Sequence, residues 1–240
     1  EGSQLAIGVG IGENYISSDQ LAMLPITNRF LYLEEGDIAR LTRSTIEVFV
    51  DGQLVDRPVK ELDAAVSNAS KGEYKHYMLK EIYEQPEAIK QTISQALNGN
   101  DLRKDFLASA EQDFAKIQQI QIIACGTSYH AGMIAKYWFE QLIDLPCQVE
   151  IASEFRYRTP VIVNHTLYVC ISQSGETADT LAALRDTQKR AAAKGLDITT
   201  MTICNVATSS MVRETQHSLL TLAGPEIGVA STKAFTTQLA

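Results

Sequence analysis

The stretch TLYVCISQSGETADTLAAL, residues 166–184, decides the fold of this 240-residue chain. Its first six residues, 166–171, form a continuous apolar run, which is typical of a strand buried on both faces of a parallel sheet. A short polar segment, Ser172–Thr177, follows, and residues 178–194 have the composition of a helix. A buried strand, a small-residue loop and a helix in this order form one unit of an α/β fold.

Similar units surround this stretch and extend to the end of the chain. The other predicted strands cover residues 117–125, 147–151, 199–205 and 218–222. The first of these strands precedes a predicted helix over 131–142, and a final helix is predicted after Ser231. We therefore expect a doubly wound α/β domain with a five-stranded parallel sheet in the flavodoxin-like order 2-1-3-4-5.

The chain before this domain has a different pattern. Short strands are predicted at 4–9, 29–33, 38–41 and 45–50, and Asp51-Gly52 is a strong hairpin turn. Such strands are typical of a small antiparallel layer, too small to be comfortable as a complete domain. We assign residues 1–62 to this β remnant and its connection, and residues 63–240 to the α/β domain.

Helices are predicted between the two parts. One covers residues 74–85, and a second begins at Pro86, where the missing N–H of proline does no harm. The second helix would end at Gly99. A further apolar stripe at helical spacing consists of Leu102, Phe106, Ala110 and Phe114.

Three polar segments should meet at one edge of the sheet, because ligands of open parallel sheets lie beyond the carboxyl ends of the strands. These segments are 125–128, 172–177 and 228–232, and all are rich in Gly, Ser and Thr. Each leads into a predicted helix, whose first N–H groups and dipole favour an anion. We refer to this edge as the rim.

The segment 172–177 has the clearest chemistry. Ser172, Ser174 and Thr177 supply hydroxyl groups and Gln173 supplies an amide, while Gly175 lets a ligand approach the backbone. The segment contains no Lys or Arg, so it suits a phosphate monoester that binds moderately and leaves quickly. The alternative is that these Ser and Thr residues only cap helices; three such segments at successive strand ends favour a binding rim.

Composition excludes several other functions. A net charge of −8 and the lack of a basic stripe argue against a nucleic-acid partner. No apolar run is long enough for a membrane helix, and no secretion leader is recognisable. The four cysteines lack metal-ligand spacing and are expected to be free thiols of a cytoplasmic protein. Neither a metal nor a cofactor is expected, since the GxGxG run at Gly8 precedes no clear helix and no P-loop is present.

Several stretches resemble the first sugar isomerase (SIS) domain of the glucosamine-6-phosphate synthase family. They are ACGTSYHAGMIAKYWFE at 124–140, ISQSGETADTLAAL at 171–184 and EIGVASTKAFTTQLA at 226–240, and KEIYEQP at 80–86, just before the domain, also matches the family. The stretch GENYISSDQLAMLPITNRFLYLEEGDIA at 12–39 resembles the end of the glutaminase domain of the same family. The SxSGxT pattern alone indicates any SIS domain, whereas the stretches at 12–39 and 226–240 are more specific.

This resemblance implies an activity and a set of ligand-binding residues. The family converts fructose 6-phosphate and glutamine into glucosamine 6-phosphate and glutamate, in amino-sugar biosynthesis. The positions that match its sugar-phosphate site are Cys125, Gly126, Thr127, Ser128, Ser172, Gln173, Ser174, Thr177, Val229 and Ser231. The family's catalytic Cys, Glu, His and Lys have no counterpart in this chain. We therefore expect this piece to bind fructose 6-phosphate or glucosamine 6-phosphate without turning it over. A homodimer through SIS domains is expected in the parent enzyme.

Two alternative functions are compared with this one. A stand-alone SIS-domain sensor or regulator would also bind a phosphosugar, but it would be expected to carry a helix-turn-helix in place of the β layer. A nucleotide-dependent Rossmann enzyme would need an acidic residue after a GxGxxG motif, and this residue is missing.

Overall fold

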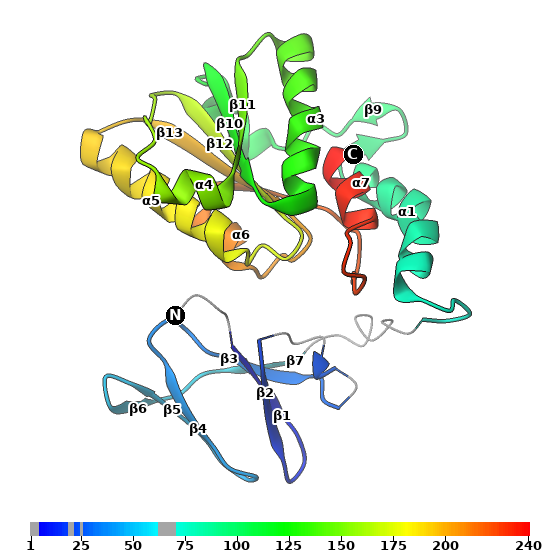
Figure 1. Ribbon diagram of the computed structural model, residues 1–240, viewed down its shortest axis with the longest axis vertical. Coiled ribbons are helices and arrows are strands. Elements are labelled where there is room, and N and C mark those ends of the chain that lie inside the picture. Colours follow the sequence, from blue (N-terminus) through cyan, green and yellow to red (C-terminus); the bar gives the residue numbers. More distant parts are fainter. Residues whose placement is uncertain (1–4, 19–21, 25, 62–70) are drawn as a thin grey trace. The chain divides into compact units, whose positions relative to one another are not determined.

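The computed structural model describes residues 5–18, 22–24, 26–61 and 71–240 (Figure 1). The chain divides into two compact units, Glu1–Ser70 and Lys71–Ala240. The boundary predicted between residues 62 and 63 lies outside the described residues. The assignment of 1–62 and 63–240 to two domains therefore stays a prediction.

The first unit contains short antiparallel strands in two sheets. One sheet has the order β2-β1-β3-β7 and the other the order β4-β5-β6. The strands are β1 Ala6–Val9, β2 Asn14–Ser17, β3 Arg29–Tyr32, β4 Ile38–Leu41, β5 Ile46–Val50, β6 Gln53–Val55 and β7 Val59–Glu61. Ile7 and Leu31 of the first sheet contact Val48 of the second in one buried cluster, so the two sheets share a core.

The hairpin predicted at Asp51-Gly52 is confirmed. Val50 pairs with Gln53, and Asp51 and Gly52 have φ values of 50° and 78°. Two consecutive positive φ angles match the twist of the flanking strands, which explains the preference for Asp-Gly at such a turn.

The second unit is an α/β domain whose sheet has the predicted topology. The five strands lie in the order β11-β10-β12-β13-β14, and every neighbouring pair is parallel. In chain order they are β10 Gln119–Ala124, β11 Cys147–Ile151, β12 Thr166–Ser172, β13 Ile198–Cys204 and β14 His217–Leu220. This is the order 2-1-3-4-5, so the expected doubly wound fold is confirmed.

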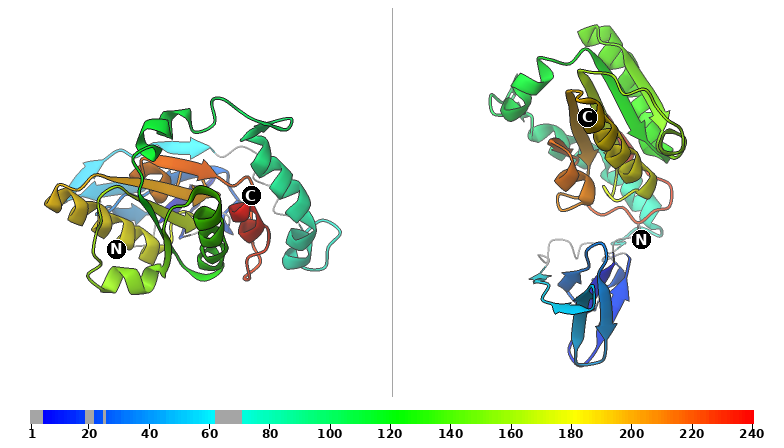
Figure 2. Two further views of the ribbon diagram at one scale, coloured as in Figure 1. Left: turned by 90° about the horizontal axis from the view of Figure 1, so that it is seen from above. Right: turned by 90° about the vertical axis from the view of Figure 1, so that its left-hand side faces the viewer.

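Helices cover both faces of this sheet. The helices of the unit are α1 Tyr77–Ser94, α2 Glu111–Phe114, α3 Gly126–Ile143, α4 Ala152–Tyr157, α5 Ala178–Lys194, α6 Ser210–Glu214 and α7 Lys233–Leu239. Of these, α3, α4, α5 and α6 contact strands of the sheet. Helix α7 packs against both α1 and α3, as Figure 1 and the left view of Figure 2 show. Across the described residues, no helix combines the length and the apolar composition needed to cross a membrane.

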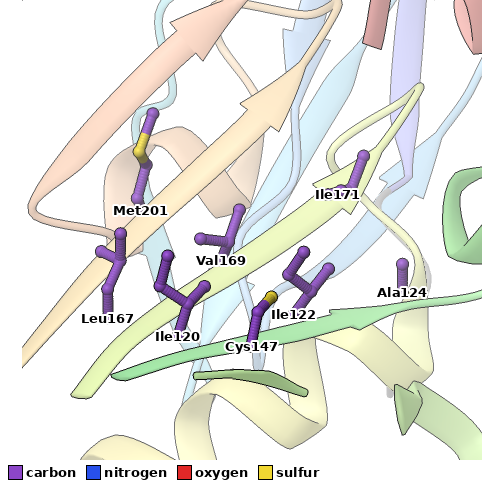
Figure 3. Close-up of a cluster of buried hydrophobic side chains, with 8 residues drawn as sticks. All are labelled: Ile120, Ile122, Ala124, Cys147, Leu167, Val169, Ile171 and Met201. Carbon is purple, nitrogen blue, oxygen red and sulfur yellow. The ribbon is translucent and has the colours of Figure 1, made fainter. Parts of the chain in front are cut away.

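Alternate residues of the central strands enter two separate cores. Ile120 and Ile122 of β10 and Val169 of β12 lie in one cluster, shown in Figure 3, against which Phe139 of α3 packs. Ile123 enters a second cluster with side chains of α4 and α5. All seven residues of β12 are buried, which accounts for the continuous apolar run that predicted this strand.

The two helices predicted around Pro86 are one helix. Helix α1 runs from Tyr77 to Ser94 with Pro86 inside it. Proline lacks the N–H that would bond to the carbonyl four residues earlier, at Ile82. The side-chain amide of Gln85 donates to that carbonyl at 3.0 Å instead, so the helix continues past the proline.

The helix predicted from the stripe between Leu102 and Phe114 is wrong. The segment contains a short hairpin of β8 (Leu97–Asn98) and β9 (Asp101–Leu102), and then a 3-10 turn, Ala108–Ala110, before α2. Gly99 has a φ of +66° within the tight turn of this hairpin, so it does not terminate the preceding helix. The apolar spacing arose from residues of separate elements: Ala110 is buried, whereas Leu102 on β9 is exposed.

Candidate functional site

The carboxyl ends of the central strands lie side by side at the rim. Ala124 at the end of β10 pairs with Ile171 of β12, and Ser172 pairs with Cys204 at the end of β13. The segments that begin at Cys125 and at Gln173 therefore leave the sheet at the same edge, as predicted. The loop after β13 leaves it there too.

The loop after β12 is organised around its hydroxyl groups. The Ser172 and Thr177 hydroxyl oxygens are 2.8 Å apart, and the backbone N–H of Gly175 donates to Ser172 Oγ at 3.1 Å. The Glu176 N–H donates to Ser174 Oγ at 3.1 Å. We call the residues Ser172–Thr177 the cradle loop. These bonds fold it into a compact turn that gathers three hydroxyl groups at the start of α5.

Gly175 makes the closest packing contact of the cradle loop. Its φ is +66°, and a Cβ at this position would lie 2.2 Å from Ser209 Oγ. The Gly175 carbonyl also accepts a hydrogen bond from the Met211 N–H at 3.1 Å. The cradle loop thus lies directly against the first residues of α6, and only glycine fits there.

Thr177 occupies the N-cap position of α5, but its hydroxyl does not cap the helix. The structure shows no cap hydrogen bond from this side chain, and its hydroxyl pairs with Ser172 instead. The first backbone N–H groups of α5 consequently donate no hydrogen bond to the Thr177 hydroxyl. Uncapped N–H groups and the positive end of the dipole are what an anion requires. The N-cap residues of α1 and α3 make no side-chain cap bond either, so the role of Thr177 in binding stays a prediction.

The segment from Cys125 to Ser128 differs from the predicted strand exit. Helix α3 begins at Gly126 and Cys125 is its N-cap, so Gly126, Thr127 and Ser128 form the first turn of the helix. The predicted helix began five residues later, because the Gly-Thr-Ser composition suggested a loop. Ser128 is buried, whereas Gly126 and Thr127 are exposed at the rim.

The segment that carries Val229 and Ser231 is folded on an acidic side chain. The Ser231 hydroxyl donates to Glu226 Oε2 at 2.9 Å, and the Thr232 and Ala234 N–H groups donate to Glu226 Oε1 at 2.8 and 3.2 Å. Glu226 therefore caps α7. Val229 is fully exposed. Both predicted residues lie on this loop, and their role in binding stays a prediction.

Asn205 links two segments of the rim and was missed by the sequence analysis. Its N–H donates to the Gln173 carbonyl at 3.0 Å. Its side chain donates to the Gly224 carbonyl at 2.8 Å and accepts from the Ala223 N–H at 2.9 Å. The position directly after a buried strand could have revealed it, since that is where ligand and rim residues gather in this fold.

An ion pair lies beside the start of α5. Arg156 Nη1 of α4 is 2.7 Å from Asp179 Oδ1 in the first turn of α5. The hydrogen bond to the Asp179 carboxylate raises the pKa of the Arg156 guanidinium further above its usual range, so the arginine stays charged. The pair leaves little net charge next to the helix N-terminus.

Two further titratable groups lie at the cradle loop. The Glu176 carboxylate accepts a hydrogen bond from the Ser210 N–H at 2.6 Å, and the second group is a buried thiol. Cys204 Sγ is 3.6 Å from Ser209 Oγ, and burial raises the pKa of the Cys204 thiol. A protonated thiol adds no negative charge that would oppose an anion. Within the described part of the chain, no group of three or more His, Cys, Asp or Glu side chains could hold a metal ion. The arrangement is suited to binding an anionic group by hydroxyl and amide hydrogen bonds.

Comparison with known proteins identifies the family of this chain. The SIS domain family matches residues 113–240, more than half of the chain. The chain belongs to the SIS domain family. The SIS match contains the cradle loop and the segments that begin at Cys125 and Glu226, but it does not contain α1.

Two relatives are similar over the whole chain. The glutamine–fructose-6-phosphate aminotransferase of Acinetobacter baylyi is 83% identical over 240 residues, which are 100% of this chain and 39% of the relative. The enzyme of the same name from Pseudomonas syringae pv. tomato is 56% identical over 241 residues, 99% of this chain and 38% of the relative. The chain thus spans about two fifths of the length of these relatives.

Solved structures show the same SIS fold. The C-terminal domain of glucosamine-fructose-6-phosphate aminotransferase from Francisella tularensis has a TM-score of 0.65 and 57% identity, covering 71% of this chain and 46% of that one. The tagatose-6-phosphate ketose/aldose isomerase of Escherichia coli has a TM-score of 0.57 at 18% identity, covering 69% and 45%. At this identity the second likeness concerns the fold alone.

Proposed function

We propose that this chain is the sugar-phosphate-binding part of a glutamine–fructose-6-phosphate aminotransferase, in which the cradle loop holds the phosphate of fructose 6-phosphate or glucosamine 6-phosphate. The identity of 83% with the Acinetobacter baylyi enzyme over all 240 residues supports the assignment to this enzyme. The reaction of the parent enzyme would convert fructose 6-phosphate and glutamine into glucosamine 6-phosphate and glutamate. In this proposal, the first unit is the end of the glutaminase domain.

The observation that carries the proposal is the geometry of the cradle loop. Three hydroxyl groups surround the start of α5, and Thr177 leaves its first N–H groups uncapped. A phosphate dianion would accept hydrogen bonds from these groups and gain from the helix dipole. The Cys125–Ser128 segment would add the first turn of α3 beside it, and Val229 and Ser231 would lie near the sugar.

A titration of the chain with fructose 6-phosphate tests this function. Calorimetry is expected to show binding with a Kd on the order of micromolar to millimolar, since a few charge-assisted hydrogen bonds are offset by the cost of association. Fructose, which lacks the phosphate, should bind far more weakly. In two-dimensional NMR, the largest shift should fall on the amides of residues 172–177. Binding of fructose and fructose 6-phosphate with equal affinity would contradict the proposal.

The ion pair beside the site leads to a second prediction. Replacing Arg156 with glutamine is expected to weaken fructose 6-phosphate binding about three- to tenfold at low ionic strength, because the Asp179 carboxylate would then repel the phosphate. Added salt should reduce the effect. The double substitution Arg156→Gln with Asp179→Asn should restore the affinity, as measured by calorimetry. If the double variant binds as weakly as the single one, the arginine does not act through Asp179.

We further propose that the parent enzyme is a cytoplasmic homodimer. The four cysteines are free, and three of them are buried, which suits a reducing compartment. Helix α3 exposes Tyr137, Trp138 and Leu142, and apolar side chains in such a row suit a subunit interface. Sedimentation of the full-length enzyme would measure the oligomeric state.

A further inference from the structure

The loop between β14 and α7 is held from outside by a buried carboxylate of α1. Glu81 is only 2% exposed, although it lies on a helix whose neighbouring residues face solvent. Its Oε1 accepts hydrogen bonds from the Ile227 N–H at 2.6 Å and from the Gly228 N–H at 3.0 Å. We call this carboxylate and the two backbone amides the amide clamp.

Gly228 packs closely against this carboxylate. A Cβ on Gly228 would lie 2.5 Å from Glu81 Oε2, and its N–H is 3.2 Å from the same oxygen. A side chain at this position would therefore displace either the carboxylate or the loop. The close approach of Gly228 thus involves the same carboxylate that holds its N–H.

An ion pair next to the amide clamp links α1 to the end of this loop, where α7 begins. Lys233, at the start of α7, is 4% exposed and donates to Glu84 Oε2 at 2.6 Å. Glu84 also lies 3.4 Å from Lys80, one turn earlier on α1. Helix α1 therefore holds the loop at its middle through Glu81 and at its end through Glu84.

We propose that Glu81 is a positioning residue for sugar binding: it fixes the loop that carries Val229 and Ser231 by binding the amides of Ile227 and Gly228. Val229 comes directly after the second clamped amide, and Glu226, which binds Ser231, comes directly before the first. The clamp therefore holds the backbone between Glu226, which is bonded to the start of α7, and Val229. The sugar-contacting part of the site thus depends on a helix that lies outside the SIS match at 113–240.

The expected effect of the amide clamp on sugar binding rests on the proposed function, whereas its expected effect on the loop does not. The test compares Glu81→Ala, Glu81→Gln and Glu87→Ala in the full 240-residue chain. Glutamine keeps the Oε1 that accepts both shorter hydrogen bonds. Glu87 is an exposed glutamate of the same helix whose Oε1 accepts from Gln91, so its replacement is a matched control.

Two measurements are made on each variant. Hydrogen exchange of the loop, without ligand, should become at least about tenfold faster in Glu81→Ala, because two hydrogen bonds to a charged acceptor are lost. Calorimetry should show fructose 6-phosphate binding about five- to twentyfold weaker in this variant, with unchanged binding of inorganic phosphate, which needs only the cradle loop. Glu81→Gln should retain most of both properties, and Glu87→Ala should retain all of both.

Gly228→Ala provides a second route if Glu81→Ala does not fold. It leaves α1 unchanged and is expected to give the same faster loop exchange and the same selective loss of sugar affinity. Unchanged loop exchange in Glu81→Ala would overturn the amide clamp. Equal weakening of fructose 6-phosphate and inorganic phosphate would also overturn it, because that result indicates a general loss of structure. If the unmodified chain binds no sugar phosphate, the proposed function fails, while the loop exchange still decides the clamp.

Discussion

Replacing Gly175 with alanine is expected to abolish detectable fructose 6-phosphate binding and to lower the free energy of unfolding by about 2–4 kcal/mol. Two costs combine at this position. A positive φ of +66° is unfavourable for any residue with a Cβ, and that Cβ would lie 2.2 Å from Ser209 Oγ. Relief of this overlap must move the cradle loop away from α6. Urea unfolding and calorimetry with fructose 6-phosphate measure the two effects.

Gly195 offers a matched control for this experiment. It ends α5 with a φ of +63°, but nothing lies within 4 Å of the place where its Cβ would be. Gly195→Ala should therefore cost only the conformational part, about 1–2 kcal/mol, and leave sugar binding unchanged. If both variants lose the same stability and both still bind, the contact of Gly175 with Ser209 has no role in shaping the cradle loop.

The double substitution Ser174→Ala with Thr177→Ala is expected to weaken fructose 6-phosphate binding at least about a hundredfold, since each hydroxyl would donate to a charged phosphate. The fold should survive. Ser172 Oγ still accepts from the Gly175 N–H, so the cost in the free energy of unfolding should stay near 1 kcal/mol. Calorimetry measures the affinity, and thermal unfolding checks the fold.

A second hydroxyl pair serves as the control for these substitutions. Thr42 Oγ1 and Thr45 Oγ1 are 2.7 Å apart on the exposed surface of the first unit. Thr42→Ala with Thr45→Ala removes the same chemical groups and should leave sugar binding as it is. Retention of affinity in the Ser174 and Thr177 variant would contradict the role proposed for the cradle loop.

The local sequence predicted most of the α/β unit because its signals are strong and short-range. The apolar run at 166–171 became the fully buried β12, and the helix predicted at 178–194 is α5 with the same ends. Strand order followed from the alternation of buried strands and helices, which leaves few topologies for a doubly wound sheet. The cradle loop was predicted for the same reason, since it directly follows such a strand.

The wrong predictions concern segments whose structure depends on a side-chain hydrogen bond or on packing against the sheet, and not on the local backbone preference alone. Pro86 normally starts or breaks a helix, but the Gln85 amide supplies the missing donor to Ile82. The Gly-Thr-Ser composition of 126–128 suggested a loop, yet these residues form the first turn of α3 against the sheet. Residue composition cannot predict either outcome. The first depends on which group donates to the Ile82 carbonyl, and the second depends on how the 126–128 turn packs against the sheet.

By itself, the sequence determined the five parallel strands, their order in the sheet and the edge at which the segments 125–128 and 172–177 leave it, because burial on both faces and small-residue turns are visible in neighbouring residues. Only the tertiary structure decided how the rim is held. Glu81 binds amides 146 and 147 residues further along the chain, and Asn205 joins the loops after β12 and β14. A buried carboxylate that accepts backbone N–H groups requires no particular donor side chain in its partner, so, apart from the glycine at 228, the partner's sequence does not indicate the contact.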